Sequence, residues 1–326
     1  MSVRDKQTEV DFSPDEIAVL APLHDAACGH VTRSLSLGDG ILLTKDLAAL
    51  EQPVRSMVWT DPRFSDMAVH LRRSETAWYF HRIKRPAEGV LANQAKLVDL
   101  LNKKFCPQIY RFALAVMIKE PVKWRLENAL VLAGPPQKVE LQGVLTFRAV
   151  KSWDSYPRSF LNDGLLEHAK SNFCALKDAD CQRIGNAGQW LLLSRARLPY
   201  DLQLMCCVIS IECLLSTDSQ ETTHKISERV AAILGNTSKE RMRLFQLMRK
   251  VYNERSKIAH GSRGTEARVQ ERERLLIDAD TIARRLLKAA ISEKDFSQKL
   301  ALKKSEDLAE FLNERVLRVP TMSDGS

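Results

Sequence analysis

Apolar residues recur at helical spacing along the second half of the chain, from about residue 159 onward. Residues 204–215 are apolar almost all round, which is typical of a buried helix, and Glu212 is the single charge in that stretch. The pattern also predicts a long amphipathic helix over residues 264–291 and a short helix over 305–317. This half is therefore expected to form a bundle of helices.

Capping residues mark two further helices between these segments. Thr222 or Thr223 can begin a helix that Gly235 ends, because glycine tolerates the left-handed conformation found at helix ends. Ser238 is expected to cap the helix that follows. Arg241 stands where a capping box would have an acid, so only half of that box is present.

The first half of the chain is less regular. Residues 76–83 are rich in aromatic side chains and predict a strand, and residues 91–105 have helical spacing. Residues 109–118 are apolar enough for a buried strand or a buried helix, and their periodicity does not decide between the two. Residues 128–150 predict a β-hairpin around a Gly-Pro-Pro turn, with a bulge near Gly143.

These patterns predict an α+β protein with two domains. The first, residues 1–155, is expected to be mixed or mostly β, although no element can be placed in its first 50 residues. The second, residues 156–326, is expected to be all-α.

Arg255 and His260 lie near the end of the helix that begins at Ser238, with four residues between them. Arg255 continues the apolar stripe of that helix, where a charge needs a partner or a ligand. His260 precedes Gly261, the expected helix stop, so the negative end of the helix dipole favours its protonated form. A permanent cation and a group that titrates near neutral pH are the two side-chain types needed to cleave RNA without a metal. The two side chains do not share one face of a regular helix, because five positions correspond to roughly 140° of rotation.

Glu212 on the buried helix is expected to pair with Arg255, which would fix the guanidinium and leave other N–H donors for a phosphate. A second interpretation explains the same residues without any chemistry. In it, Glu212 and Arg255 form a structural ion pair, and His260 is an exposed residue at a helix end.

Three segments of the second half, residues 206–215, 226–235 and 251–261, together resemble an Apea-like HEPN domain, one branch of the HEPN superfamily. The matching pieces read Ile-Glu-Cys-Leu-Leu, Ile-Ser-Glu-Arg-Val-Ala-Ala-Ile-Leu-Gly and Tyr-Asn-Glu-Arg-Ser-Lys-Ile-Ala-His-Gly. The last carries the family's Arg-x4-6-His signature. The resemblance covers about residues 180–291. One departure is Ser256 directly after the arginine, where many catalytic members have Asn, Asp or His.

The resemblance implies a helical bundle that dimerises and, in active members, a metal-independent endoribonuclease. In that reaction the ribose 2′-hydroxyl attacks the adjacent phosphorus and a cyclic phosphate results. His260 would transfer protons and Arg255 would stabilise the charged phosphorane. Four neighbouring residues are expected to support these two: Glu212, Asn253, Ser256 and Lys257.

The resemblance also implies a role in antiviral defence or as a toxin. The expected partners are RNA, a second copy of the chain through its helical half, and a regulatory protein or phage-derived trigger at the N-terminal domain. No cofactor, metal or membrane is expected to take part. The alternative is a non-catalytic HEPN scaffold, or a module that binds RNA or a nucleotide within a larger complex.

Composition and charge are compatible with this hypothesis. The net charge is +8, and residues 221–326 hold 22 Lys and Arg against 16 Asp and Glu, a balance of +6. An anionic partner therefore suits the helical half, although helix surfaces of mixed sign explain part of this charge. No apolar h-region opens the chain, and its seven cysteines include no Cys-x-x-Cys pair, which favours a cytoplasmic protein. His24, Cys28 and His30 superficially offer metal ligands, but no fourth ligand stands at zinc-site spacing.

Overall fold

A computed structural model of the 326-residue chain describes residues 13–23, 31, 34–44, 47, 54, 77–119, 128–134, 140–146, 162–195, 198–218, 223–260, 269–302 and 304–318. The fold is α+β, and the chain divides into two compact units, Met1–Cys174 and Ala175–Ser326. The division falls inside helix α6 (Asp163–Asp178), later in the chain than the boundary expected at residue 155.

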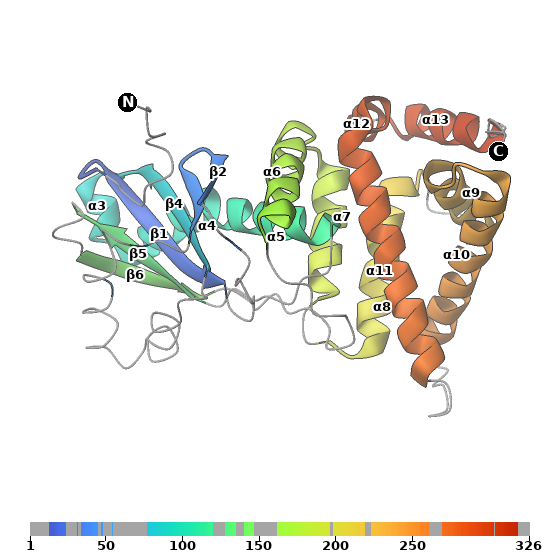
Figure 1. The fold of residues 1–326 in the computed structure, drawn as a ribbon, viewed down its shortest axis with the longest axis horizontal. Coiled ribbons are helices and arrows are strands. Elements are labelled where there is room, and N and C mark those ends of the chain that lie inside the picture. The colour runs from blue at the N-terminus through green and yellow to red at the C-terminus, as the bar shows by residue number, and fades with distance from the viewer. Residues whose placement is uncertain are drawn as a thin grey trace. The chain divides into compact units, whose positions relative to one another are not determined.

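The described part of the first unit contains a six-stranded antiparallel sheet in the order β2-β3-β4-β1-β5-β6 (Figure 1). The strands are β1 (Glu16–Leu23), β2 (Leu35–Gly38), β3 (Ile41–Thr44), β4 (Ala77–Lys84), β5 (Asn128–Ala133) and β6 (Glu140–Thr146). β1 pairs with β4 on one side and β5 on the other, and all but its first residue are buried. Its apolar residues do not alternate with polar ones, as expected for a strand with both faces covered.

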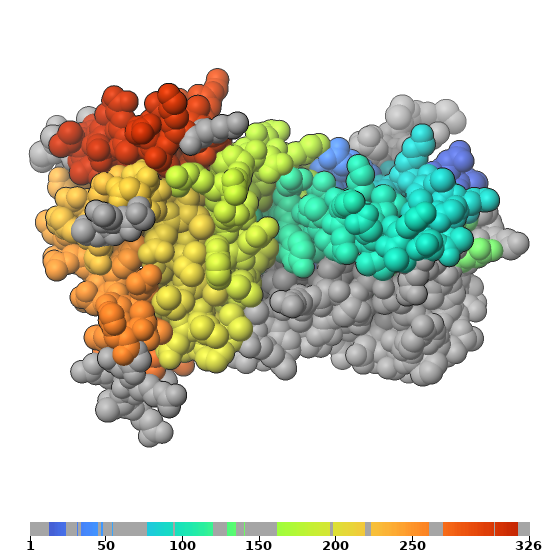
Figure 2. Space-filling view, turned by 180° about the vertical axis from the view of Figure 1, so that it is seen from behind, coloured from blue at the N-terminus to red at the C-terminus, as the bar shows by residue number. Residues whose placement is uncertain are grey.

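The first unit also contains the helices α3 (Glu88–Leu91), α4 (Gln94–Lys104) and α5 (Cys106–Lys119), which form the cyan to blue-green surface in Figure 2. Aromatic residues of α5 and of the end of α4 pack against β4. Tyr79 of β4 contacts Phe105 with ring centroids 5.9 Å apart and Phe112 at 5.5 Å. His81, two residues further along β4, stacks on Phe105 at 5.2 Å. All four side chains are buried, so this cluster forms the core between sheet and helices.

Several sequence predictions for this unit are confirmed. The strand predicted over 76–83 is β4, the helix predicted over 91–105 contains α4, and the predicted hairpin is β5 and β6. The pairing of β5 with β6 skips Gln142, so a bulge lies directly beside Gly143. The ambiguous segment 109–118 is helical, within α5.

The second unit is a helical bundle, as predicted (Figure 1). Its helices are α7 (Gln182–Leu193), α8 (Tyr200–Leu215), α9 (Thr223–Leu234), α10 (Ser238–Ala259), α11 (Val269–Ser292), α12 (Lys294–Ala301) and α13 (Ser305–Leu317). The apolar segment 204–215 lies in α8, and eight of its residues are buried. α12 was not predicted. The long helix predicted from residue 264 is described from residue 269, and residues 261–268, Gly261 included, lie outside the described residues.

Two arginines bind the C-terminal end of α8. Arg183 of α7 donates hydrogen bonds to the carbonyl oxygens of Cys213, at 3.2 Å, and Ser216, at 2.7 Å. Arg229 of α9 is fully buried and donates to the carbonyl oxygen of Leu215 at 2.6 Å. The last carbonyls of a helix lack intrahelical partners and carry its negative dipole end, so two guanidinium groups stabilise this terminus.

A buried charge cluster joins α7 to α11. The carboxylate of Asp280 is fully buried and pairs with Arg195, at the end of α7, and with Arg284, whose Nε lies 2.9 Å from Oδ2 of Asp280. Each oxygen of the carboxylate therefore faces a different guanidinium, which offsets the cost of removing the charges from water.

The N-terminal cap of α10 differs from the one predicted. Thr237, not Ser238, is the cap, and its hydroxyl accepts a 3.2 Å hydrogen bond from the backbone N–H of Glu240. The Glu240 carboxylate accepts a bond from the N–H of Asn236, which holds the pKa of Glu240 below its usual value. The acid is thus present in the capping turn, and Arg241 instead donates to the carbonyl that ends α9. Sequence reasoning misplaced the cap by one residue because both Thr and Ser are good caps.

Candidate functional site

Arg255 and His260 lie at the end of α10, near the beginnings of α8 and α11 (Figure 1). Arg255 follows Val251 on the core-facing stripe of α10 and is half-buried. His260 is the C-cap residue of α10: its backbone N–H donates to the carbonyl of Ser256 at 3.1 Å, and its side chain is exposed. The imidazole therefore stands at the C-terminal end of α10, where the helix dipole is negative.

Glu212 does not pair with Arg255, and that expectation is wrong. Oε1 of Glu212 accepts a 2.9 Å hydrogen bond from the hydroxyl of Tyr252 on α10. Tyr252 is buried and one turn before Arg255, so its phenol reaches the carboxylate that was assigned to the arginine. Glu212 is thereby fixed by a neutral donor and contributes to the packing of α8 on α10.

The guanidinium of Arg255 consequently lacks the acceptor predicted for it. Its Nε is buried and has no hydrogen-bond partner within the described part of the chain. A buried N–H without an acceptor is costly and uncommon in folded proteins. Arg255 also has no ion pair among the described residues, so its charge is not neutralised by an acidic partner there.

Arg272 connects the three helix ends next to Arg255. Its guanidinium pairs with Asp201 in the first turn of α8, and its Nε lies 3.3 Å from Oε1 of Glu254 on α10. The same guanidinium stacks over the ring of Tyr200, with its carbon 4.3 Å from the ring centroid. We call Tyr200, Asp201, Glu254 and Arg272 the Arg272 cluster. Because Glu254 directly precedes Arg255, the cluster fixes the turn of α10 that carries the candidate site.

Tyr200 has no hydrogen-bond acceptor for its hydroxyl within the described residues. Burial and the neighbouring charge of Glu254 raise the pKa of this phenol well above its usual value, so it stays neutral. Sequence reasoning missed Tyr200 and Arg272, because they are far from Arg255 along the chain. The signal that was available is Asp201, the acid in the first turn of a helix whose one other charged residue is Glu212.

The three remaining supporting residues, Asn253, Ser256 and Lys257, are all exposed. Lys257 contacts the carboxylate of Glu254, with Nζ 3.3 Å from Oε2, and so belongs to the edge of the Arg272 cluster. The backbone carbonyl of Ser256 accepts the hydrogen bond from the N–H of His260 and so fixes the backbone of that residue. Their exposure leaves Asn253 and Ser256 accessible to a ligand.

One copy of the chain does not bring the two predicted catalytic groups together on one face. They are five positions apart on a helix and its cap, which corresponds to roughly 140° around the axis. Arg255 is half-buried beside the core stripe, whereas His260 is exposed. A site that uses both needs a ligand or a second surface that spans the end of α10.

The aromatic residues of β4 and the buried Cys207 do not form a functional site. Trp78, Tyr79 and Phe80 are buried in β4 and do not offer a stacking surface. Burial raises the pKa of the Cys207 thiol, which keeps it protonated. No group of three or more His, Cys, Asp and Glu among the described residues has the arrangement of a metal site. The segment with His24, Cys28 and His30 lies outside the described residues. Across the described part of the chain, every helix is too short or too polar to serve as a membrane span.

Comparison of the chain with protein-family models, with curated proteins and with solved structures finds no match. The function proposed below therefore depends on the resemblance carried by three segments of the chain and on the geometry of its residues.

Proposed function

We propose that this protein is a metal-independent endoribonuclease of the HEPN type, with Arg255 and His260 as its catalytic residues. The observation that supports the proposal is the half-buried Arg255, whose Nε has no acceptor among the described residues, five positions before the exposed His260. A phosphodiester supplies the missing acceptor, and the 2′-hydroxyl of RNA supplies an internal nucleophile.

The resemblance to HEPN domains implies the chemistry of these two groups. The 2′-oxygen attacks the adjacent phosphorus while a neutral imidazole accepts its proton, and a pentacoordinate phosphorane forms. The bond from phosphorus to the 5′-oxygen then breaks, an imidazolium protonates that oxygen, and a 2′,3′-cyclic phosphate remains. Arg255 stabilises the additional negative charge on the phosphorane. Proton transfer by a placed imidazole contributes about 10²–10⁴-fold in rate, and a placed cation contributes about 10²–10³-fold.

A homodimer supplies the geometry that one chain lacks. Two α10 ends that face each other across a twofold axis would place two arginines and two histidines around one phosphate. In this arrangement the Arg255 of one copy and the His260 of the other belong to the same site. The two side chains of one copy, which lie roughly 140° apart around the helix axis, then do not have to reach the same phosphate.

In this proposal the first unit regulates the second, either by recognising a trigger or by docking a partner. The activity serves antiviral defence or acts as a toxin, and it takes place in the cytoplasm. The supporting observation is limited to its separate, compact fold, which holds none of the proposed catalytic residues. The rival function is a non-catalytic scaffold, which the exposed position of His260 at a helix end also suits.

Incubation of the full-length protein with total RNA, with and without a chelator, tests the proposal. Cleavage that persists in chelator and yields cyclic phosphate ends is expected, with losses of at least a hundredfold in His260→Ala and in Arg255→Ala. Lys103→Ala, a change to an exposed lysine of the other unit, is the control and should cleave normally. No cleavage by the wild-type chain at concentrations where it is dimeric would favour the scaffold.

A further inference from the structure

The outer side of α13 carries three acidic side chains and no base. α13 lies beside α9 (Figure 1), and its inner side is buried through apolar residues. Glu306, Glu310 and Glu314 are exposed and follow one another at intervals of four residues, which places them on the same side of the helix. None of the three carboxylates has a hydrogen bond or ion pair within the described residues. This side of α13 therefore presents negative charge that the described chain does not neutralise.

Leu317 adds an apolar side chain to the C-terminal end of the same side. It is 81% exposed, more than any other large apolar residue of the described chain. Leu317 follows Glu306 by about three helical turns, so the two residues point in nearly the same direction. We call Glu306, Glu310, Glu314 and Leu317 the α13 face. It has the composition of a helix that docks into a groove, with an apolar anchor and charges of one sign around it.

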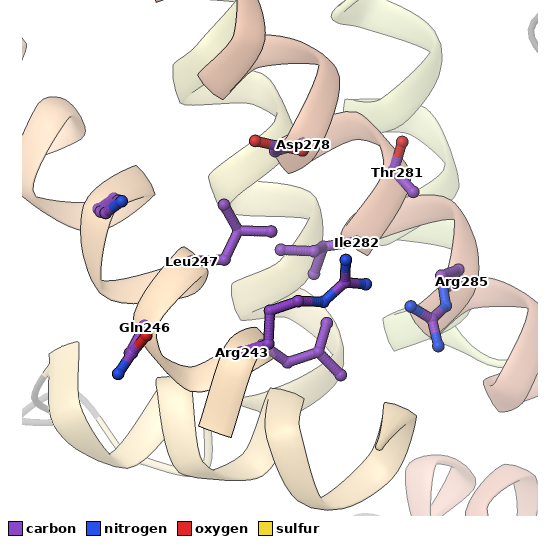
Figure 3. Close-up of a pocket in the computed structure, with 9 residues that line it drawn as sticks. Arg243, Gln246, Leu247, Asp278, Thr281, Ile282 and Arg285 are labelled. Atoms are coloured by element: carbon purple, nitrogen blue, oxygen red, sulfur yellow. The ribbon is translucent and has the colours of Figure 1, made fainter. Parts of the chain in front are cut away.

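A groove of about 320 Å³ lies between α10 and α11 of the same unit (Figure 3). Leu244 of α10 and Ile282 of α11 line it and are almost fully buried, so they form its floor. In Figure 3 the side chain of Leu247 extends from α10 toward Ile282. The floor is therefore apolar, and an apolar side chain that entered the groove would be removed from water together with it.

The rim of this groove is basic. Arg243 and Lys250 of α10 are exposed, and neither has a hydrogen bond or ion pair within the described residues. Arg285 of α11 is the third base of the lining and pairs with Glu240 at 3.3 Å. One acid, Asp278, belongs to the described lining, and its charge is opposed by Arg243 and, less strongly, by Lys250. The lining therefore keeps a net positive charge.

The α13 face and the α10–α11 groove complement each other in charge and in polarity. Carboxylates on the helix match the bases of the rim, and Leu317 matches the apolar floor. Opposite charges orient two surfaces as they approach, and like charges exclude wrong partners. The described lining contains no aromatic ring on which a base could stack, so an acidic helix suits the groove better than RNA does. Since the inner side of α13 is packed in its own bundle, its outer face is available to a second copy of the chain.

We propose that the α13 face of one copy docks into the α10–α11 groove of another copy. Leu317 enters the apolar floor, and the carboxylates of the α13 face contact Arg243 and Lys250. This contact joins two different surfaces, so it is distinct from a twofold contact between two α10 ends, and it either closes a reciprocal pair or adds copies in a row. It does not depend on RNA cleavage, because neither surface contains a residue of the proposed catalytic pair.

Sedimentation velocity of the full-length protein, measured over a range of concentrations at low and at high salt, tests the contact. The wild type is expected to associate as its concentration rises, and salt should weaken the association because it screens exposed charges. A groove variant, Arg243→Glu/Lys250→Glu, and a helix variant, Glu310→Lys/Glu314→Lys, should each raise the dissociation constant by at least about tenfold, because like charges then meet. Leu317→Ser should weaken the association as well, since the apolar anchor is lost.

Mixing the two charge-reversed variants identifies the contact. In an equimolar mixture, the acidic groove of one variant meets the basic helix of the other, and the unchanged groove and helix also match. The mixture should therefore associate about as tightly as the wild type, although neither variant does so alone. A twofold contact between α10 ends has no reason to respond in this way.

Arg249→Glu/Lys103→Glu is the matched control, because it reverses two exposed bases that do not line the groove, and it should associate as the wild type does. All the changed side chains are exposed, so circular dichroism should show unchanged folding. A wild-type chain that stays monomeric, or a mixture that associates no more than each variant alone, would overturn the proposal. So would a groove variant that loses affinity for single-stranded RNA but self-associates normally, since that result assigns the basic rim to nucleic acid.

Discussion

The hydroxyl of Tyr252 on α10 donates a 2.9 Å hydrogen bond to the carboxylate of Glu212 on α8. This bond supplies the carboxylate with a partner, while Nε of Arg255, one turn further along α10, is left without one in the described chain. The arginine is therefore available to a ligand in a way that an ion pair with Glu212 would have prevented.

Removal of this hydrogen bond should lower stability moderately. Tyr252→Phe and Glu212→Ala are each expected to reduce the free energy of unfolding by about 1–2 kcal/mol, because a partly buried bond to a carboxylate is lost. The double variant should lose less than the sum of the two, as measured by denaturant unfolding in a double-mutant cycle. Glu212→Gln and Arg255→Gln should instead be additive within about 0.5 kcal/mol. Strong coupling between Glu212 and Arg255 would contradict the geometry described here.

The fold was largely predictable wherever one local signal decided it. The all-round apolar character of residues 204–215 identified the buried helix α8, and the Gly-Pro-Pro turn identified the β5–β6 hairpin. Strands β1 to β3 were missed, because β1 is buried on both faces and has no alternation to mark it as a strand. Segment 109–118 was ambiguous for the same reason, since a fully apolar run has no periodicity.

The candidate site was predictable only in part. The sequence placed Arg255 and His260 at the end of one helix, since both belong to the same local pattern. It paired Glu212 with Arg255 because charge alone suggested the partner, whereas a neutral phenol reaches the carboxylate first. The contacts of Arg272 with α8 and α10 depend on the register between helices, which no local pattern encodes.

Asp280 should be among the most sensitive positions of the second unit. Its replacement by alanine leaves Arg195 and Arg284 buried without their shared carboxylate. The expected cost is about 3–5 kcal/mol of unfolding free energy, measured by chemical denaturation. Asp278→Ala, two residues away on the same helix, is the matched control, because that carboxylate has no described partner and its removal should cost little. Equal losses in the two variants would show that the buried cluster does not contribute as argued.

His81 should make the stability of the first unit depend on pH. Burial in the aromatic cluster lowers the pKa of this imidazole from 6.5 to about 4, against a smaller opposing effect of Asp39. The unfolded chain therefore binds a proton between pH 6.5 and 4 that the folded chain does not, so stability is complete above about pH 6.5 and falls as the pH is lowered toward 4. The loss attributable to this residue is on the order of 3 kcal/mol.

Thermal unfolding at pH 7 and pH 5 measures this effect. His81→Phe keeps an aromatic ring against Phe105 and removes the titrating group, so its melting temperature should decrease less between the two pH values than that of the wild type. The exposed His224 provides a control, because His224→Gln should show the wild-type difference. If His81→Phe and the wild type lose the same stability on acidification, the buried imidazole is not responsible.

Arg272 should act as a positioning residue for the end of α10. Arg272→Lys retains the charge, but an ammonium does not reproduce the planar fork that contacts Asp201 and Glu254 while it stacks on Tyr200. Loss of one partly buried charge-assisted hydrogen bond, worth about 1.5–3 kcal/mol, should speed amide hydrogen exchange in the last turn of α10 by at least about tenfold. Exchange at the start of α10, around Glu240, should not change, and it serves as the internal reference.

Arg272→Lys should also lower the kcat of the proposed nuclease while KM changes little, because the substrate is still bound but Arg255 is no longer held in place. Unaltered exchange in the last turn would show that α10 is ordered by its packing alone, without the help of Arg272.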